Sequence, residues 1–137
     1  MLIFRKIKLD DLDAIYKDQK LRPLLTTEAP GERFSVIIDQ DEHIQGGVSG
    51  YIKDDKAYIS CIVIKDSSKN DAALFDGLIR SLIYILDREG VKELYTNGAG
   101  YDPLYTRIGF KPVKAEGQPY SFVISISEFF NDRHHCH

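Results

Sequence analysis

Two parts of the chain carry side chains that could bind a metal ion or attack an electrophile. The end of the chain holds His134, His135, Cys136 and His137, whose imidazole and thiol groups are metal ligands. Because the four are adjacent at a terminus and lack the separated pairs of a structural zinc site, we expect no metal there and a frayed tail over residues 131–137. Cys61 lies in an apolar run with no histidine or acid patterned around it, so we expect a free and inert thiol.

A polar run in the middle of the chain stands directly before a long apolar pattern. It consists of Ser68, Lys69, Asn70, Asp71, Ala72 and Ala73. Serine, asparagine and aspartate often cap the first turn of a helix, because their side chains accept hydrogen bonds from free backbone N–H groups. The run therefore indicates the start of a helix.

The helix that follows is the strongest pattern in the sequence. Apolar residues recur at spacings of three and four over residues 72–86, which predicts a long amphipathic helix. They are Leu74, Phe75, Leu78, Ile79, Leu82, Ile83 and Leu86. Gly90 is placed to end this helix in a left-handed conformation, and residues 91–96 then predict a strand. A helix between two strands indicates a parallel crossover.

The first half of the chain predicts a strand, a helix and a meander. Residues 2–8 alternate as a strand does, and Asp10 is the expected N-cap of a helix that ends near Arg22, because Pro23 restricts the residue before it. Residues 21–33 are expected to be irregular or briefly helical and to form a lip over a pocket. Residues 34–39, 44–53 and 56–65 predict three strands, and residues 57–64 are apolar on both faces, as a central strand should be.

The rest of the chain completes an α/β pattern. After a Gly-rich turn at residues 97–101, Asp102 and Pro103 are the expected N-cap and first residue of a short helix that Gly109 ends. Residues 110–113 and 120–127 predict two closing strands. The order of elements predicts a single α/β domain over residues 1–130 with a mixed sheet. Ligands of such sheets bind beyond the carboxyl ends of neighbouring parallel strands.

Composition and charge exclude several classes of function. The chain has 137 residues, of which 43% are hydrophobic and 28% charged, as in ordinary globular domains. A formal net charge of -3 argues against a nucleic-acid partner, which would need clustered Lys and Arg. No apolar run approaches the ~20 residues of a membrane span, and no signal peptide is recognisable, so we expect no membrane partner and a cytoplasmic location.

The run from Leu104 to Phe110 places Tyr105, Gly109 and Phe110 in the spacing Y-x-x-x-G-F. This spacing resembles the signature of the GNAT superfamily of N-acetyltransferases, in which it marks the last helix and the strand after it. The predicted order of elements is also similar to that of the family over nearly the whole chain. The resemblance implies a mostly antiparallel sheet with one central parallel strand pair, flanked by helices, and acetyl-coenzyme A as cosubstrate without a metal.

The resemblance also implies which residues hold the cosubstrate. The strand at residues 57–64 would run alongside the pantetheine arm, so the backbone of Ile62, Val63 and Ile64 is expected to bind it. An amide-bearing arm needs free backbone donors and acceptors, which a splayed pair of parallel strands supplies.

The pyrophosphate of the cosubstrate is held in the family by a loop resembling R/Q-x-x-G-x-G/A at the start of the long helix. Here the polar run named above takes that place, with Ser68 instead of a basic or amide residue and Asp71 instead of the first glycine. A carboxylate at Asp71 would repel a pyrophosphate from a helix end that should attract it, and Lys69 would offset part of that repulsion. A phosphate-binding loop and a simple helix cap both remain open.

Tyr105 is the catalytic candidate that the resemblance implies. In many GNAT enzymes this tyrosine donates a proton to the departing coenzyme A thiolate, and a phenol with a pKa of about 10 is protonated near neutrality. A core tyrosine that anchors the last helix is the alternative. Many relatives carry an asparagine seven residues earlier, where Gly98 stands here, so Asn97 is either a displaced cofactor contact or a turn residue.

Taken together, these observations predict transfer of an acetyl group from acetyl-coenzyme A to an amine of a small molecule or protein, by direct attack. The alternative is a GNAT-like binding module that has lost catalysis and binds a metabolite or protein partner. Tyr58, Ser60 and Glu28 are candidates for a general base by position alone. Homodimerisation is a further expectation from the family.

Overall fold

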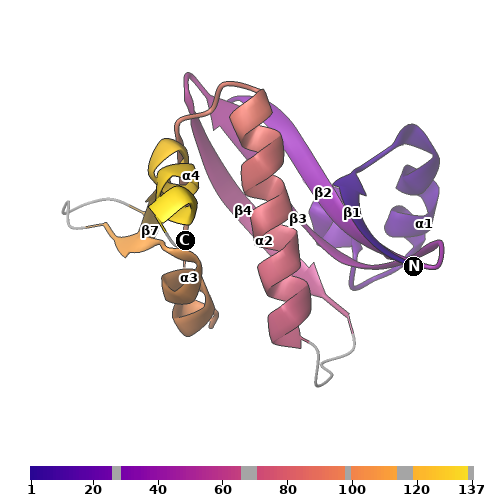
Figure 1. The fold of residues 1–137 in the computed structure, drawn as a ribbon. Helices are drawn as coiled ribbons and strands as arrows, with labels where there is room; N and C mark the ends of the chain where they lie inside the picture. Colours follow the sequence, from indigo (N-terminus) through magenta and orange to yellow (C-terminus); the bar gives the residue numbers. More distant parts are fainter. Residues whose placement is uncertain (26–28, 66–70, 98–99, 114–118, 136–137) are drawn as a thin grey trace.

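The described residues form one sheet of seven strands in the order β1-β2-β3-β4-β5-β7-β6. Figure 1 shows α2 lying along this sheet. The computed structural model describes residues 1–25, 29–65, 71–97, 100–113 and 119–135, with side chains as far as Asn131. Along the chain the elements are β1 (Leu2–Lys6), the 3-10 helix η1 (Leu9–Asp11), α1 (Leu12–Lys17), the 3-10 helix η2 (Arg22–Leu25), β2 (Glu32–Gln40), β3 (His43–Lys53), β4 (Lys56–Ile64), α2 (Asp71–Arg88), β5 (Glu93–Thr96), α3 (Asp102–Ile108), β6 (Lys111–Pro112), β7 (Phe122–Ser125) and α4 (Ile126–His135).

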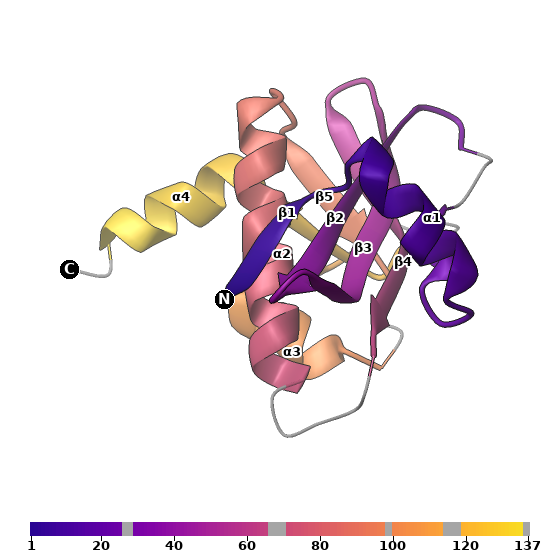
Figure 2. The same cartoon turned by 90° about the vertical axis from the view of Figure 1, so that its right-hand side faces the viewer.

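The predicted sheet is confirmed in its main features. β1, β2, β3 and β4 pair antiparallel, β4 and β5 form the parallel pair, and β7 pairs antiparallel with both β5 and β6. β4 lies in the middle of the sheet, as its two apolar faces predicted. α2 is the crossover between the two parallel strands, and it lies across one face of the sheet while α1 lies on the other (Figure 2).

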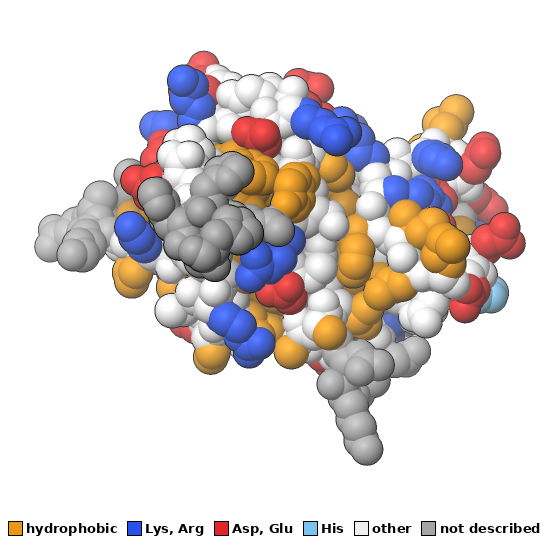
Figure 3. All heavy atoms as spheres, viewed as in Figure 1, with side chains coloured by type: hydrophobic (Ala, Val, Ile, Leu, Met, Phe, Trp, Pro, Cys, Tyr) orange, Lys and Arg blue, Asp and Glu red, His pale blue; other side chains and the backbone are white. Residues whose placement is uncertain are grey.

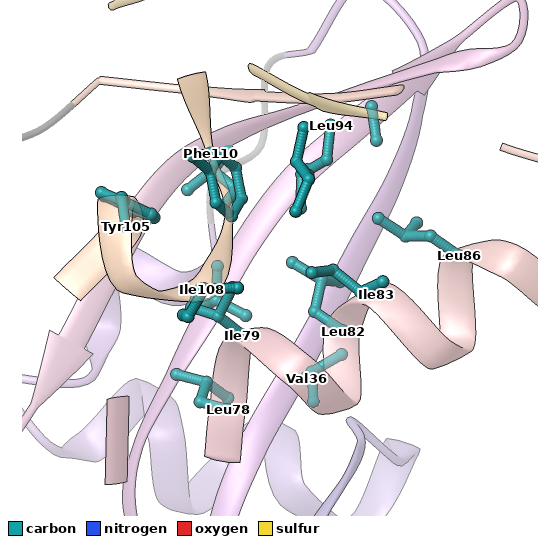
Figure 4. Packing of buried hydrophobic residues seen from close by; sticks show 14 of the residues in the cluster. Val36, Leu78, Ile79, Leu82, Ile83, Leu86, Leu94, Tyr105, Ile108 and Phe110 are labelled. Atoms are coloured by element: carbon teal, nitrogen blue, oxygen red, sulfur yellow. The ribbon is translucent and has the colours of Figure 1, made fainter. Parts of the chain in front are cut away.

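The main core lies between α2 and the sheet (Figure 4). The apolar residues of the predicted stripe on α2 are buried from Phe75 to Leu86. They pack against the inward side chains of β2, β4 and β5 and against Ile108 and Phe110 at the end of α3. Gly90 follows with φ +80°, so the glycine stop of the helix is confirmed, and Gly109 ends α3 with φ +125°.

A second, smaller core holds α1 and η2 against the opposite face of the sheet. Its fully buried members are Ile15, Leu21, Leu24 and Ile37. Charged groups fix the start of this layer, since the guanidinium of Arg5 donates two bonds to Asp11, at 2.8 and 3.0 Å, and one to Asp39 at 3.0 Å. These contacts tie β1, η1 and β2 together.

The boundaries of three helices differ from the predictions. Lys8, not Asp10, is the N-cap of η1, and the carboxylate of Asp11, three residues on, accepts the backbone N–H of Lys8 at 2.7 Å. α1 ends at Lys17 rather than near Arg22, because Asp18 takes an extended conformation and its carboxylate accepts a bond from Lys20 N–H instead. α3 begins at Asp102, one residue earlier than predicted, with Tyr101 as its N-cap.

The C-terminal part also differs from its prediction. The last strand ends at Ser125, and the backbone from Ile126 to His135 forms α4 where a longer strand and a frayed tail were expected. Phe129 and Phe130, in the first half of α4, pack on the core and anchor the helix.

Two further observations concern the length of the helices and the charges on the surface. Within the described part of the chain, no helix combines the length and the apolar character needed to cross a membrane. On the face seen in Figure 1, charged side chains of both signs are interspersed with hydrophobic ones (Figure 3).

Candidate functional site

The parallel strands β4 and β5 separate soon after they meet. Their pairing begins with Lys56 opposite Glu93 and ends with Tyr58 opposite Tyr95. β4 continues for six residues beyond Tyr58, to Ile64, while β5 ends at Thr96 and is paired there with β7. The sheet therefore opens at the carboxyl ends of these two strands, which is where α/β sheets bind ligands.

Ile62, Val63 and Ile64 lie in the part of β4 that has left β5. β3 pairs with them on one side, and no strand among the described residues pairs with their other edge. An extended backbone edge with free N–H and C=O groups can bind another extended, amide-bearing chain. The strand geometry expected for these three residues is therefore present.

A β-bulge distorts β4 next to this opening. The register of β3 and β4 shifts between Ser49 and Gly50, which leaves Ser60 as an extra residue of β4 without a partner on β3. A side chain on Gly50 would overlap the carbonyl oxygen of Tyr58 and the ring of Phe34, so glycine is required for the strands to approach here. A bulge redirects a side chain and frees backbone groups, and such bulges are common beside active sites.

A cavity of about 640 Å³ lies between the sheet and the layer formed by α1 and η2. The sheet supplies its floor, and α1 and η2 supply its apolar cover. The lining residues are Ile7, Leu12, Asp13, Tyr16, Leu24, Leu25, Ala29, Arg33, Phe34, Ser35, Ser49, Gly50 and Ser60. The segment predicted to form a lip over a pocket contributes Leu24, Leu25, Ala29 and Arg33, whereas residues 26–28, which include Glu28, lie outside the described part.

Two of the serines on the cavity floor use their hydroxyl groups in hydrogen bonds that hold η2. Ser49 is 3% exposed and donates its hydroxyl proton to the carbonyl oxygen of Leu24 at 2.7 Å. The hydroxyl oxygens of Ser35 and Ser49 are 2.6 Å apart. The Ser35 hydroxyl also lies 3.4 Å from the Leu24 carbonyl oxygen, but the shorter bond to that oxygen takes the single proton of Ser49, so Ser35 is the donor of the serine pair. The bulge residue Ser60 is exposed, so it is the floor serine that can meet a ligand.

A row of tyrosines continues the sheet face beyond the cavity. Tyr51, Tyr58 and Tyr95 stand opposite one another on β3, β4 and β5, with ring centroids 5.0 and 5.2 Å apart. Tyr120 leans across from the segment before β7, and its hydroxyl is 2.8 Å from that of Tyr51. Burial, and then the bond to Tyr51, raise the pKa of Tyr120. The row forms a half-buried aromatic wall beside the opened strands.

Tyr105 lies in the main core, on the α2 side of the sheet. Its side chain is 0% exposed, and its ring packs among the aromatic rings of Phe75, Phe110 and Phe122. The hydroxyl is 3.0 Å from Oγ1 of Thr96, which itself donates to the carbonyl oxygen of Asn97 at 3.0 Å. Tyr105 is therefore the donor to Thr96, and burial raises its pKa. In this structure Tyr105 is a buried core residue, which was the alternative to its catalytic role.

The start of α2 contains only part of the predicted phosphate loop. Ser68, Lys69 and Asn70 lie outside the described residues, while Asp71 is the first residue of α2 and Ala72 and Ala73 are exposed in its first turn. Burial, and then the charge of Asp71, raise the pKa of Tyr101. Asn97 is exposed at the end of β5, the position expected of either a turn residue or a ligand contact.

Sequence reasoning missed the cavity-lining residues of α1 and the tyrosine row. Leu12 and Tyr16 were assigned to a helix without a role, and Tyr51 and Tyr95 were assigned to strands. A signal for the row was present, because Tyr51 and Tyr58 fall at mirrored positions around the tight turn of a predicted hairpin. Among the described residues, no group of three or more His, Cys, Asp or Glu side chains is placed to hold a metal ion.

Comparison with known proteins identifies the fold. No family model and no curated protein matches the sequence. Solved structures match over nearly the full length of both chains. An aminoglycoside 6'-acetyltransferase type Ii has a TM-score of 0.66 at 15% identity, covering 90% of this chain and 97% of that one. The PaiA N-acetyltransferase from Thermoplasma acidophilum, in complex with coenzyme A, has a TM-score of 0.65 at 13% identity, covering 91% and 99%.

A third structure carries the family name that the Y-x-x-x-G-F spacing indicated. An acetyltransferase of the GNAT family from Staphylococcus aureus has a TM-score of 0.67 at 10% identity, covering 92% of this chain and 99% of that one. The mixed sheet, the single parallel pair and the flanking helices are thus those of known acetyltransferases, and the chain has the GNAT fold.

Proposed function

We propose that the chain is an N-acyltransferase that moves an acetyl group from acetyl-coenzyme A to an amine of a small molecule or protein. The observation that supports this most is the separation of β4 from β5 beyond Tyr58, next to the bulge at Ser60. It leaves an extended backbone edge of the kind that can bind the two amides of a pantetheine arm. The cavity opens beside Ser60, so an amine held there would approach the end of that arm.

The reaction needs few groups from the protein. The neutral amine attacks the thioester carbonyl carbon, the C–S bond breaks as the C–N bond forms, and the amine proton leaves as the coenzyme A thiolate takes up a proton. Binding both reactants in one site supplies much of the rate, because it replaces an encounter in solution. Backbone N–H groups freed by the bulge are candidates to bind the developing oxyanion.

Tyr105 remains the proposed donor of the proton to the thiolate, on the condition that its hydroxyl is released from Thr96. Its hydroxyl proton is bonded to Thr96, so transfer would require that bond to open when the cosubstrate binds. If Tyr105 is the acid, Tyr105→Phe should lower kcat by roughly 10² or more with little change in cosubstrate affinity. Unchanged turnover would leave Tyr105 with its role in the core alone.

The second candidate function, a binding module without catalysis, is favoured by two specific observations. A carboxylate, Asp71, occupies the first position of α2, where a pyrophosphate would need positive potential. The phenol of Tyr105 is closed off in the core. Both features would be neutral in a protein that uses the cavity to bind another ligand.

Titration calorimetry separates the two candidates. Acetyl-coenzyme A should bind the purified chain with micromolar affinity, about -8 kcal/mol, and dephospho-coenzyme A should bind more weakly if the 3'-phosphate is recognised. A screen of amines for thiol release then tests transfer. Absence of binding at millimolar acetyl-coenzyme A would refute the acyltransferase and leave the binding module.

A further inference from the structure

The cavity between the sheet and α1 restricts the chemistry of what it can hold. Its cover is mainly apolar, since α1 and η2 contribute Leu12, Leu24 and Leu25 beside Asp13 and Tyr16. On its floor, the hydroxyls of Ser35 and Ser49 are already bonded to each other and to the Leu24 carbonyl. A ligand there is therefore recognised mainly by the burial of its own apolar surface, which suits cavities of this size.

The charges on the cavity wall do not suit a ligand with several positive charges. The lining contains one carboxylate, Asp13, and one guanidinium, Arg33. Asp13 is paired with Lys17 on the next turn of α1, at 2.9 Å between Oδ2 and Nζ. Recognition of a polycation needs several acidic groups in excess, because each desolvated ammonium requires a partner. The described lining supplies no such excess.

We infer that the acceptor of this chain is an amine carried on a hydrophobic body, with no second positive charge. This inference rests on the proposed function, since it names the acceptor of the same site. The amine reaches the bulge at Ser60, and its apolar body lies under Leu12 and Leu25. The tyrosine row begins at the edge of this floor, because Arg33 on β2 stands opposite Tyr51, so the space beyond the cavity is also lined by rings.

Three amines test the inference. 2-Phenylethylamine has an apolar body, ethylamine lacks most of it, and spermidine has several charges. Each is titrated calorimetrically into the full chain saturated with coenzyme A, and each is then offered with acetyl-coenzyme A while thiol release is followed. 2-Phenylethylamine should bind at least about ten-fold more tightly than the other two, because a phenyl ring buries a large apolar area.

A matched pair of variants assigns the preference to this cavity. Leu12 lines it and is 38% exposed, whereas Leu9, one turn earlier, is 83% exposed and lies outside the lining. Leu12→Asn should weaken 2-phenylethylamine binding by about five-fold or more, and Leu9→Asn should leave it within two-fold, with unfolding curves showing that both variants fold.

The outcomes separate this inference from the proposed function. Preferential binding of 2-phenylethylamine without thiol release would refute acyl transfer and support the apolar amine site. Thiol release with spermidine or ethylamine as the better acceptor would support acyl transfer and overturn the inference. Equal losses of affinity in Leu12→Asn and Leu9→Asn would also overturn it.

Discussion

The hydrogen bond between Tyr105 and Thr96 should show itself in a double-mutant cycle of stability. Tyr105→Phe removes a buried hydroxyl that is bonded to Oγ1 of Thr96, while Thr96 keeps its own bond to the Asn97 carbonyl. No donor is left without a partner, so the loss should be about 1 kcal/mol, the usual net value of such a bond. For a chain of this length that corresponds to a fall in Tm of roughly 3 °C.

Thr96→Val should cost more, although it also removes a single hydroxyl. It leaves the phenol of Tyr105, which is 0% exposed, without an acceptor, and a stranded buried donor costs about 1–3 kcal/mol. Adding Tyr105→Phe then removes the stranded donor, so the double variant should be more stable than Thr96→Val alone.

Urea unfolding of the four proteins measures the cycle, with Tyr16→Phe as control because Tyr16 is 63% exposed. The control should change the free energy of unfolding by less than about 0.5 kcal/mol. Strict additivity of Tyr105→Phe and Thr96→Val would refute the reasoning, since it would mean that water reaches the phenol. The same result would make Tyr105 accessible to a cosubstrate.

Three further predictions concern other parts of the chain. Asp71→Asn should tighten coenzyme A binding by roughly three- to ten-fold if the start of α2 meets the pyrophosphate, because it removes a like charge at a helix end. Calorimetry that shows no change would mean that the start of α2 does not contact the pyrophosphate. The Arg5 guanidinium lowers the pKa of Asp11, so the stability from this pair is present above the unfolded-state pKa and is lost as pH falls through the folded-state value. Asp11→Asn should therefore lower stability near neutrality by roughly 1–3 kcal/mol and flatten the acid limb of a plot of Tm against pH, and an unchanged acid limb would contradict the assignment. Gly90→Ala should cost about 1 kcal/mol by thermal unfolding, because a side chain there meets no atoms but φ is +80°, and a neutral result would mean that the turn relaxes.

Much of the fold could be predicted because it is encoded in local patterns. The three- and four-residue spacing of apolar residues predicted α2, and the alternation of apolar and polar residues predicted the meander of β2, β3 and β4. Gly90 and Gly109 marked helix ends because both positions need positive φ. The spacing of Tyr105, Gly109 and Phe110 indicated the GNAT fold that the structural comparison then showed.

Boundaries set by competing side chains were predicted less well. Residue type does not distinguish Asp10 from Asp11, and only the bonds from Arg5 and from the Lys8 N–H show that the Asp11 carboxylate holds the start of η1. The end of α1 at Lys17 likewise depends on Asp18, whose carboxylate accepts a bond from Lys65, 47 residues away in the chain. A bond between residues so far apart in the chain produces no periodic pattern in the sequence.

The sequence by itself determined α2, α3, the strands of the meander and the order of these elements along the chain, because each follows from periodicity and from residues near in the chain. The residues of the candidate cosubstrate edge came from the resemblance to the GNAT family, and α4 was not predicted. The tertiary structure alone decided that β4 bulges at Ser60, that α1 and η2 enclose a cavity over β2 and β3, and that the Tyr105 hydroxyl donates a hydrogen bond to Thr96. These features depend on strand register and on packing between segments far apart in the chain. A one-residue change of register would move each side chain to the other face of the sheet, and no local pattern specifies that choice.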